Sequence, residues 1–149
     1  MITDFYTPLF EATKSVFHLM LDVSDVHECS MDAFKYRDIL NISIGVIGDY
    51  EGEIVYKFPQ DMSLNMVNIM SGMEISSVDD FVTSAVSEIA NIISGNVLTM
   101  LTEENVRCDI LTPAVRDAED TKKYALKNDF CISTSAGKVC LDIRLNPTK

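Results

Sequence analysis

The strongest constraint on the fold is a long segment, residues 80–102, whose apolar residues recur at helical spacing. At 100° per residue, one side of this predicted helix carries Val82, Val86, Ile89, Ile93, Val97 and Met100. A helix with one continuous apolar side is stable when it buries that side against another layer of structure. Residues 77–80 resemble a capping box, and their acidic side chains favour the positive end of the helix dipole.

The segments on either side of this helix predict a sheet and two further helices. Helices are expected over residues 8–21 and 60–71, and strands over residues 26–29, 42–50, 53–58, 106–111, 130–135 and 138–145. Thr7 is the expected N-cap of the first helix, with Pro8 at its first position, and Gly72 is the expected end of the middle helix. The remaining segments, residues 30–38 and 114–128, are expected to be loops.

The order of these elements gives the predicted fold class. A helix, a short strand and a hairpin occur in that order twice, and the middle helix joins the two halves. We therefore predict an α+β fold in a single domain, residues 1–149. One central β-sheet is covered by two long helices and a shorter middle helix.

The polar side of the long helix carries the candidate functional residues. Ser84, Glu88, Asn91 and Gly95 fall within about 60° of one another, opposite the apolar side. Glu88 and Asn91 stand one turn apart, and their small neighbours allow another surface to approach closely. The same pattern also fits ordinary polar residues on a solvated helix. However, glycine inside a helix costs about 1 kcal/mol relative to alanine, so local stability does not explain this choice of residues.

Charge excludes two classes of partner. The chain has 23 acidic and 12 basic residues, a net charge of -11, and no Lys/Arg run longer than Lys122-Lys123. Neutralising nucleic-acid phosphates or anchoring to an anionic membrane surface requires clustered cations, so we expect no nucleic-acid partner and no membrane partner. The first residues lack the pattern of a signal peptide, and polar residues interrupt the apolar stretch 89–101. A cytoplasmic protein is expected.

The cysteines do not suggest a metal site. The chain has four of them, Cys29, Cys108, Cys131 and Cys140. None forms a Cys-x-x-Cys pair, and only His18 and His27 are available to supplement them. We expect no metal or cofactor of the protein's own, and four small buried thiols in a reducing compartment.

The polar pattern on the long helix resembles a known family. Ser84-x-x-x-Glu88-x-x-Asn91, with Pro113 22 residues after the asparagine, is similar to the pattern of the CheC/CheX/FliY phosphatases of bacterial chemotaxis. Residues 85–96, 108–113 and 52–59 also resemble that family, and the likeness covers about residues 5–145. CheC-type members carry two such helices and CheX-type members one. The first helix here has Lys14 where the asparagine would be, which favours the CheX type. Ser87 departs from the family, in which glycine is commoner before the glutamate.

The resemblance implies a substrate and a role for each residue. The substrate would be the aspartyl phosphate of a CheY-like response regulator, which supplies Mg²⁺ from its own acidic pocket. Asn91 would position the attacking water, and Glu88 would pair with a lysine of the regulator. Ser84, Gly95 and Pro113 would contact this partner.

The resemblance also implies a homodimer that pairs through its sheets. An alternative from another functional class stays open at this point. The same fold occurs in flagellar-switch proteins, so the chain would then be a non-catalytic module that binds response regulators.

Overall fold

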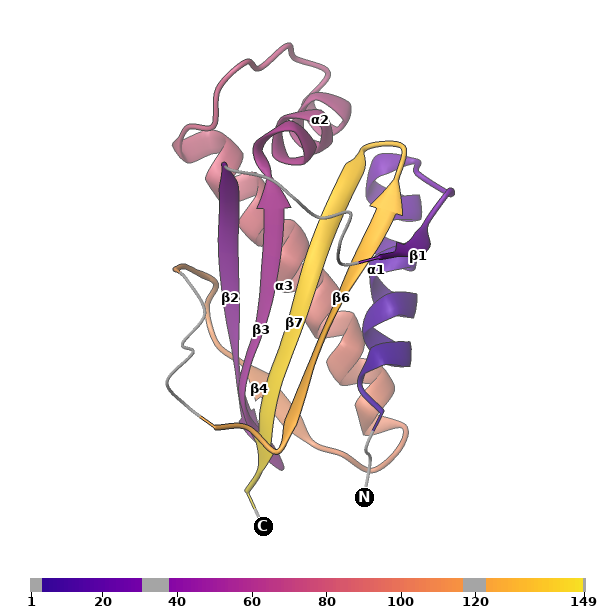
Figure 1. The fold of residues 1–149 in the computed structure, drawn as a ribbon, viewed down its shortest axis with the longest axis vertical. Coiled ribbons are helices and arrows are strands. Elements are labelled where there is room, and N and C mark those ends of the chain that lie inside the picture. The colour runs from indigo at the N-terminus through magenta and orange to yellow at the C-terminus, as the bar shows by residue number, and fades with distance from the viewer. Residues whose placement is uncertain (1–3, 31–37, 117–122, 149) are drawn as a thin grey trace.

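The computed structural model describes residues 4–30, 38–116 and 123–148 (Figure 1). The helices are α1 (Tyr6–Leu21), α2 (Gln60–Ser71) and α3 (Asp80–Thr102). The strands are β1 (His27–Cys29), β2 (Ile39–Gly48), β3 (Tyr50–Pro59), β4 (Cys108–Ile110), β5 (Ala114–Val115), β6 (Leu126–Thr134) and β7 (Gly137–Pro147). The fold is therefore α+β, as predicted, with α1 and α3 behind the sheet in the view of Figure 1.

The strand order relates the two halves of the chain. Within the described residues, seven antiparallel strands form one sheet in the order β1-β6-β7-β3-β2-β4, with β5 paired to β2. The short strand β1 of the first half thus extends the β6–β7 hairpin of the second half. Conversely, β4 of the second half extends the β2–β3 hairpin of the first. The predicted repeat of helix, short strand and hairpin is present, and each half completes the sheet of the other.

The two faces of the sheet have different contents. The face toward the helices carries Ile42, Ile44, Val46, Ile54, Tyr56, Phe58, Val139, Leu141, Ile143 and Leu145, all in one hydrophobic core. Because side chains alternate along a strand, the intervening residues point to the opposite face. On that face Arg144 pairs with Asp142, and its Nη2 atom lies 2.8 Å from the carboxylate oxygen Oδ2. Ser43 donates to Glu53 at 3.0 Å. Each of these buried groups thus has a polar partner, as buried charges require, although Oδ1 of Asp142 accepts no hydrogen bond among the described residues.

The helix termini confirm one prediction and correct two. The middle helix ends just before Gly72, which has a φ of 71°. The N-cap of α3 is Asp79 and not Ser77, the first residue of the predicted capping box, because the Asp79 side chain accepts from the Val82 amide at 3.0 Å. The predicted N-cap at Thr7 is wrong. The α1 helix starts at Tyr6, because the Asp4 carboxylate accepts from the backbone N–H groups of Tyr6 and Thr7 and satisfies them earlier in the chain.

The segment predicted as a loop over residues 114–128 is partly strand. A short strand, β5, pairs with β2, and β6 begins at Leu126 although polar residues follow it. Pairing with β7 extends β6 to that point, since Leu126 lies opposite Leu145. Of the other predicted loop, residues 30–38, positions 31–37 lie outside the described residues.

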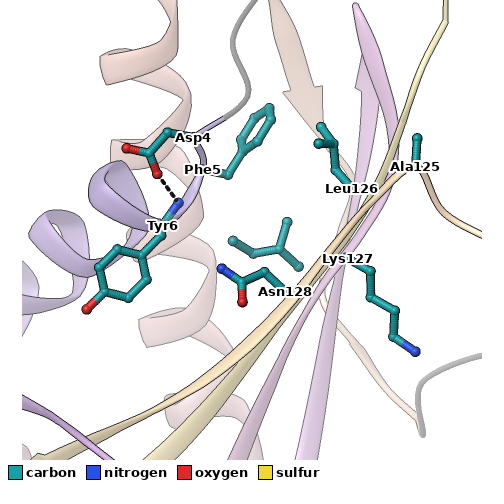
Figure 2. Close-up of a pocket in the computed structure, with 8 residues that line it drawn as sticks. Asp4, Phe5, Tyr6, Ala125, Leu126, Lys127 and Asn128 are labelled. Atoms are coloured by element: carbon teal, nitrogen blue, oxygen red, sulfur yellow. Dashed lines mark hydrogen bonds between the residues drawn. The ribbon is translucent and has the colours of Figure 1, made fainter.

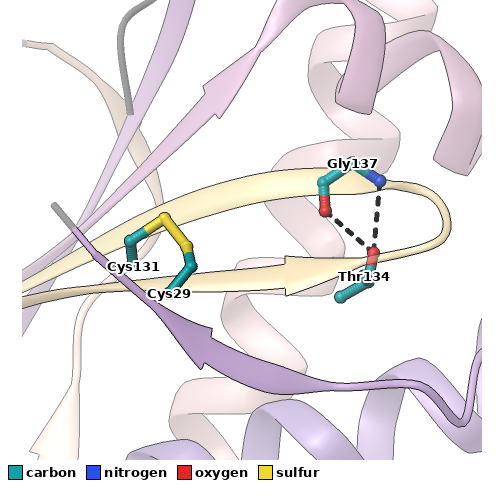
Figure 3. Close-up of a disulfide and its surroundings, with 4 residues drawn as sticks. All are labelled: Cys29, Cys131, Thr134 and Gly137. Carbon is teal, nitrogen blue, oxygen red and sulfur yellow. Dashed lines mark hydrogen bonds between the residues drawn. A yellow bond between two sulfur atoms is a disulfide. The ribbon is translucent and has the colours of Figure 1, made fainter. Parts of the chain in front are cut away.

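The prediction of four buried thiols is wrong. Cys29 and Cys131 form a disulfide that joins β1 to β6 (Figure 3). The register makes these residues cross-strand partners, with Cα atoms 5.2 Å apart, within the range that a disulfide bridges. Cys140 is buried and lies outside this disulfide, and the free thiol of Cys108 is half-buried.

The apolar stretch 89–101, which polar residues interrupt, lies within the longer helix α3. By length and composition alone, α3 is long and apolar enough to span a membrane. The core helix of a soluble protein passes the same test, and the apolar side of α3 is buried in the core behind the sheet.

Candidate functional site

The orientation of α3 is fixed by its buried side. This side consists of Val82, Val86, Ile89, Ala90, Ile93, Ser94, Val97 and Leu101. Met100, predicted to be in the core, is only partly buried, and Leu101 takes the core position instead. The apolar contacts hold the helix on the sheet, so the residues on its opposite side have a defined direction.

One polar contact lies within this buried side. The Ser94 hydroxyl is 2.8 Å from the hydroxyl of Tyr56 on β3, and both residues are fully buried. Burial raises the pKa of Tyr56, which therefore keeps its proton at neutral pH. Because a buried hydroxyl without a partner is costly, this pair favours the one rotation of α3 that brings Ser94 to Tyr56. Helix wheel reasoning had not identified Ser94.

The predicted site residues lie together on the outer side of α3. We call Ser84, Glu88, Asn91 and Gly95 the α3 stripe. Ser84 and Glu88 are exposed, whereas Asn91 and Gly95 are half-buried, so the stripe is less solvated toward its C-terminal end than predicted. Within the part of the chain that the structure describes, the side chains of Glu88 and Asn91 have no hydrogen bond or ion pair. Their polar atoms are thus available to a partner.

Close packing within the fold does not explain the glycine at position 95. Apart from its chain neighbours and the adjoining backbone of α3, a Cβ atom built at this position would meet no atom within 4 Å. By contrast, a Cβ at Gly52 would lie 1.9 Å from the carbonyl oxygen of Arg144, and there glycine is required by the backbone. Packing against the rest of the fold therefore does not require glycine at position 95, and the missing side chain leaves open space on the outside of α3.

Phe81 adds an apolar residue to this surface that the sequence analysis did not single out. It is 51% exposed and lies three residues before Ser84, within about 60° of it on the helix. A half-exposed aromatic ring beside polar groups is a common anchor in protein interfaces. The available signal was the spacing of three and four residues from Phe81 through Ser84 to Glu88.

Pro113 lies apart from the helix in sequence and in secondary structure. It is half-buried in the segment between β4 and β5, next to Ala114, which pairs with Ser43 on β2. The α3 helix packs against β2 and β4, the two strands that lie next to this segment in the sheet. Its contribution to the site stays a prediction.

The α3 stripe does not line the cavity drawn in Figure 2. The cavity in Figure 2, of about 300 Å³, lies between the start of α1 and strand β6, and its lining includes Tyr6 and Leu126 but no stripe residue. Among the described residues, no three His, Cys, Asp or Glu side chains are grouped so as to hold a metal ion. A carboxylate and an amide one turn apart on a helix are suited to insertion into the site of another protein.

Comparison with known proteins finds a family that matches most of the chain. A protein-family model described as chemotaxis phosphatase CheX matches residues 40–135, which include the whole α3 stripe and Pro113. The CheY-P phosphatase CheX of Thermotoga maritima is 32% identical over 80 residues, which are 53% of this chain and 52% of that protein. The chain thus spans about half the length of the curated relative it matches.

Solved structures share the fold over nearly the full length. Chemotaxis protein CheX from Vibrio vulnificus has a TM-score of 0.81 at 20% identity, with coverage of 96% of this chain and 97% of that one. The complex of CheX and CheY with BeF3 and Mg²⁺ from Borrelia burgdorferi has a TM-score of 0.76 at 22% identity, with 97% and 99% covered. At these identities the likeness concerns the arrangement of the sheet and the three helices.

Proposed function

The chain belongs to the CheX family of chemotaxis phosphatases, and from this premise we propose that it hydrolyses the aspartyl phosphate of a CheY-like response regulator. The observation that carries the proposal is the pair Glu88 and Asn91, one turn apart on α3 and without partners among the described residues. A relative with the same fold forms a complex with CheY, which supports a regulator as the partner here.

Asn91 is the residue proposed to act in the chemical step. Hydrolysis requires a water oxygen to attack phosphorus in line with the bond to the aspartyl oxygen, which leaves as a carboxylate. An amide both donates and accepts hydrogen bonds and does not titrate, so Asn91 can hold the water beside a charged phosphoryl group. Mg²⁺ bound in the regulator's own pocket would neutralise charge on the phosphoryl oxygens.

Glu88 and the rest of the stripe are proposed to dock the regulator. The Glu88 carboxylate would pair with a lysine of the regulator and set the register of the complex. Ser84 and Gly95, which have little or no side chain, let the regulator approach the helix backbone. Phe81 and Pro113 would extend this contact beyond the stripe.

The chain is also proposed to act as a cytoplasmic homodimer. Strand β1 pairs with β6 only over residues 131–133, so in the described part residues 126–130 of β6 have a single neighbouring strand, β7. An open edge of this kind favours pairing with a second copy about a two-fold axis. Light scattering at micromolar concentration tests this proposal, and a purely monomeric mass would contradict it.

Phosphate release distinguishes catalysis from the alternative of a non-catalytic binding module. A CheY-like regulator is phosphorylated in Mg²⁺ buffer, and the loss of its phosphoryl group is followed with and without the chain. The proposal predicts faster loss with a substoichiometric amount of the chain, because each molecule turns over repeatedly. Binding to the regulator with an unchanged phosphoryl lifetime would instead establish the binding module.

A further inference from the structure

Three of the four cysteines lie in one row across the sheet. Cys29 on β1 is the register partner of Cys131 on β6, and Cys131 is the register partner of Cys140 on β7. Directly opposed residues of antiparallel strands project from the same face of a sheet. The three side chains therefore stand side by side, with Cys131 in the middle.

This row lies on the face of the sheet that points away from the helices. Phe130, Ile132 and Leu141, which flank these cysteines along β6 and β7, belong to the hydrophobic core, whereas Cys131 and Cys140 do not. Both cysteines are nevertheless almost fully buried, at 0% and 1% exposure, while Cys29 is half-buried. The outermost member of the row is thus the one that solvent reaches.

The order of the row matches the geometry of thiol–disulfide exchange. A thiolate attacks one sulfur of a disulfide from the side opposite the sulfur that leaves. Neighbouring strands are about 4.8 Å apart, so β7 brings Cys140 to one side of Cys131 while the bond to Cys29 extends to the other. The Cys29–Cys131 disulfide is formed in the structure, and Cys140 keeps its sulfur outside any disulfide.

We propose that Cys29, Cys131 and Cys140 form a thiol–disulfide exchange site. The Cys140 thiolate attacks Sγ of Cys131, a Cys131–Cys140 bond forms, and the Cys29–Cys131 bond breaks. The electron pair of the broken bond stays on Cys29, which takes up a proton equivalent to the one that Cys140 lost. One disulfide and one thiol are present before and after, so the step needs no oxidant or reductant. Its result is that β1 loses its covalent tie to β6 and a half-buried thiol appears at Cys29.

Burial and the neighbouring charges control the thiolate fraction of Cys140, on which the rate of exchange depends. Burial raises the pKa of the Cys140 thiol to about 11, and Asp129 on β6 and Asp142 on β7 act in the same direction. Lys57 on β3, the register partner of Cys140, opposes them by favouring the thiolate. The thiolate fraction therefore grows about tenfold for each pH unit below that pKa, and the rate of exchange should grow with it.

Alkylation followed by peptide mapping tests the proposal on the full-length oxidised protein. The protein is incubated with iodoacetamide and no reductant at pH 7 and pH 9, then digested and mapped by mass spectrometry without reduction. We expect alkylated Cys29 together with a Cys131–Cys140 disulfide peptide, formed about 100-fold faster at pH 9, in proportion to the thiolate of Cys140. An intact Cys29–Cys131 disulfide and unmodified Cys29 at both pH values would overturn the proposal.

Two variants and a control define the route. Cys140→Ser should slow alkylation of Cys29 at least tenfold, because the attacking group is missing. Cys108→Ser removes the free thiol of β4 at the far edge of the sheet and should behave as wild type. In Cys29→Ser, oxidised glutathione should produce the Cys131–Cys140 disulfide, and its absence would contradict the proposed row. These outcomes do not depend on phosphatase activity.

Discussion

The two long helices present the same spacing of polar residues with different chemistry. On α3 the four positions hold Ser84, Glu88, Asn91 and Gly95, and on α1 the positions with the same intervals hold Thr7, Glu11, Lys14 and His18. All four α1 residues are exposed. The third position differs in function, because an ammonium group donates hydrogen bonds and cannot accept one from a water. The fourth differs in shape, since an imidazole ring occupies the space that Gly95 leaves open.

The helices also differ in how polar contacts attach them to the sheet. Ser94 of α3 bonds to Tyr56 inside the core, where both residues are fully buried. On α1 the hydroxyl of Tyr6 donates to the exposed carboxylate of Glu28 on β1. The comparison teaches that equivalent helices of a repeat can share a pattern while only one has the groups and the fixed orientation that the proposed chemistry needs.

The largest expected effect separates the two helices directly. Asn91→Ala should slow phosphate release from the phosphorylated regulator at least about 100-fold, because it removes the group that positions the attacking water. Lys14→Ala, the matched change on α1, should leave the rate unchanged. Equal losses in the two variants would end the assignment of the site to α3.

The second prediction compares the two tyrosine contacts through the free energy of unfolding. Tyr56→Phe should cost about 1–3 kcal/mol because it leaves the Ser94 hydroxyl buried without its partner. Tyr6→Phe should cost less than about 1 kcal/mol, since water can replace the lost contact of Glu28. Urea denaturation measures both. The double variant Tyr56→Phe/Ser94→Ala should regain part of the loss, and a further loss there would contradict a simple paired hydrogen bond.

A third prediction concerns the open space at Gly95. Gly95→Ala should stabilise the fold by about 0.5–1 kcal/mol, because alanine is the better helix former and its Cβ meets no neighbour. Gly95→Gln should fold as well but raise the regulator concentration at half-maximal rate, since its side chain fills the docking surface. Thermal denaturation and the concentration dependence of phosphate release check the two parts. Unchanged half-saturation in Gly95→Gln would show that the regulator does not approach at this turn.

The smallest predicted effect is the pH dependence of the α1 contact. Burial, together with Glu28, raises the pKa of Tyr6 to about 12, above its ordinary value of 10.0. Because Tyr6 holds its proton more tightly in the folded state than in the unfolded chain, the protonated hydroxyl stabilises the fold. This contribution is fully present below pH 10 and is lost as the pH rises through about 12. The stability difference between wild type and Tyr6→Phe should therefore shrink across that interval. A difference that stays constant to pH 12 would contradict the raised pKa.

Local signals in the sequence predicted much of the fold. Gly72 marked the end of α2, and the alternating pattern located both hairpins. The predicted start of α1 was wrong because a side chain outside the predicted helix decides it. The Asp4 carboxylate accepts from the amides of Tyr6 and Thr7 and lets the helix begin earlier. The disulfide of Cys29 and Cys131 depends on pairing between strands 102 residues apart, and spacing along the chain carries no information about that register.

For the candidate site, the sequence predicted which residues share one side of α3 but did not predict how deeply they are buried. Helical periodicity alone grouped the α3 stripe on one side of the helix, because the angle between residues is fixed by helix geometry. The partial burial of Asn91 and Gly95 depends on neighbouring elements and was not predicted. The contact between Ser94 and Tyr56 was missed for the same reason, since it joins α3 to a strand 38 residues earlier.

The most direct test of the central claim is a saturation titration of phosphate release by wild type, Glu88→Ala and Asn91→Ala. The phosphorylated regulator is held at low concentration while each protein is raised to saturation in single turnovers. Glu88→Ala should need a higher concentration yet approach the wild-type plateau, because it loses docking. Asn91→Ala should bind with the wild-type midpoint but reach a plateau at least about 100-fold lower. A wild-type plateau for Asn91→Ala would contradict the claim that this residue acts in the hydrolysis.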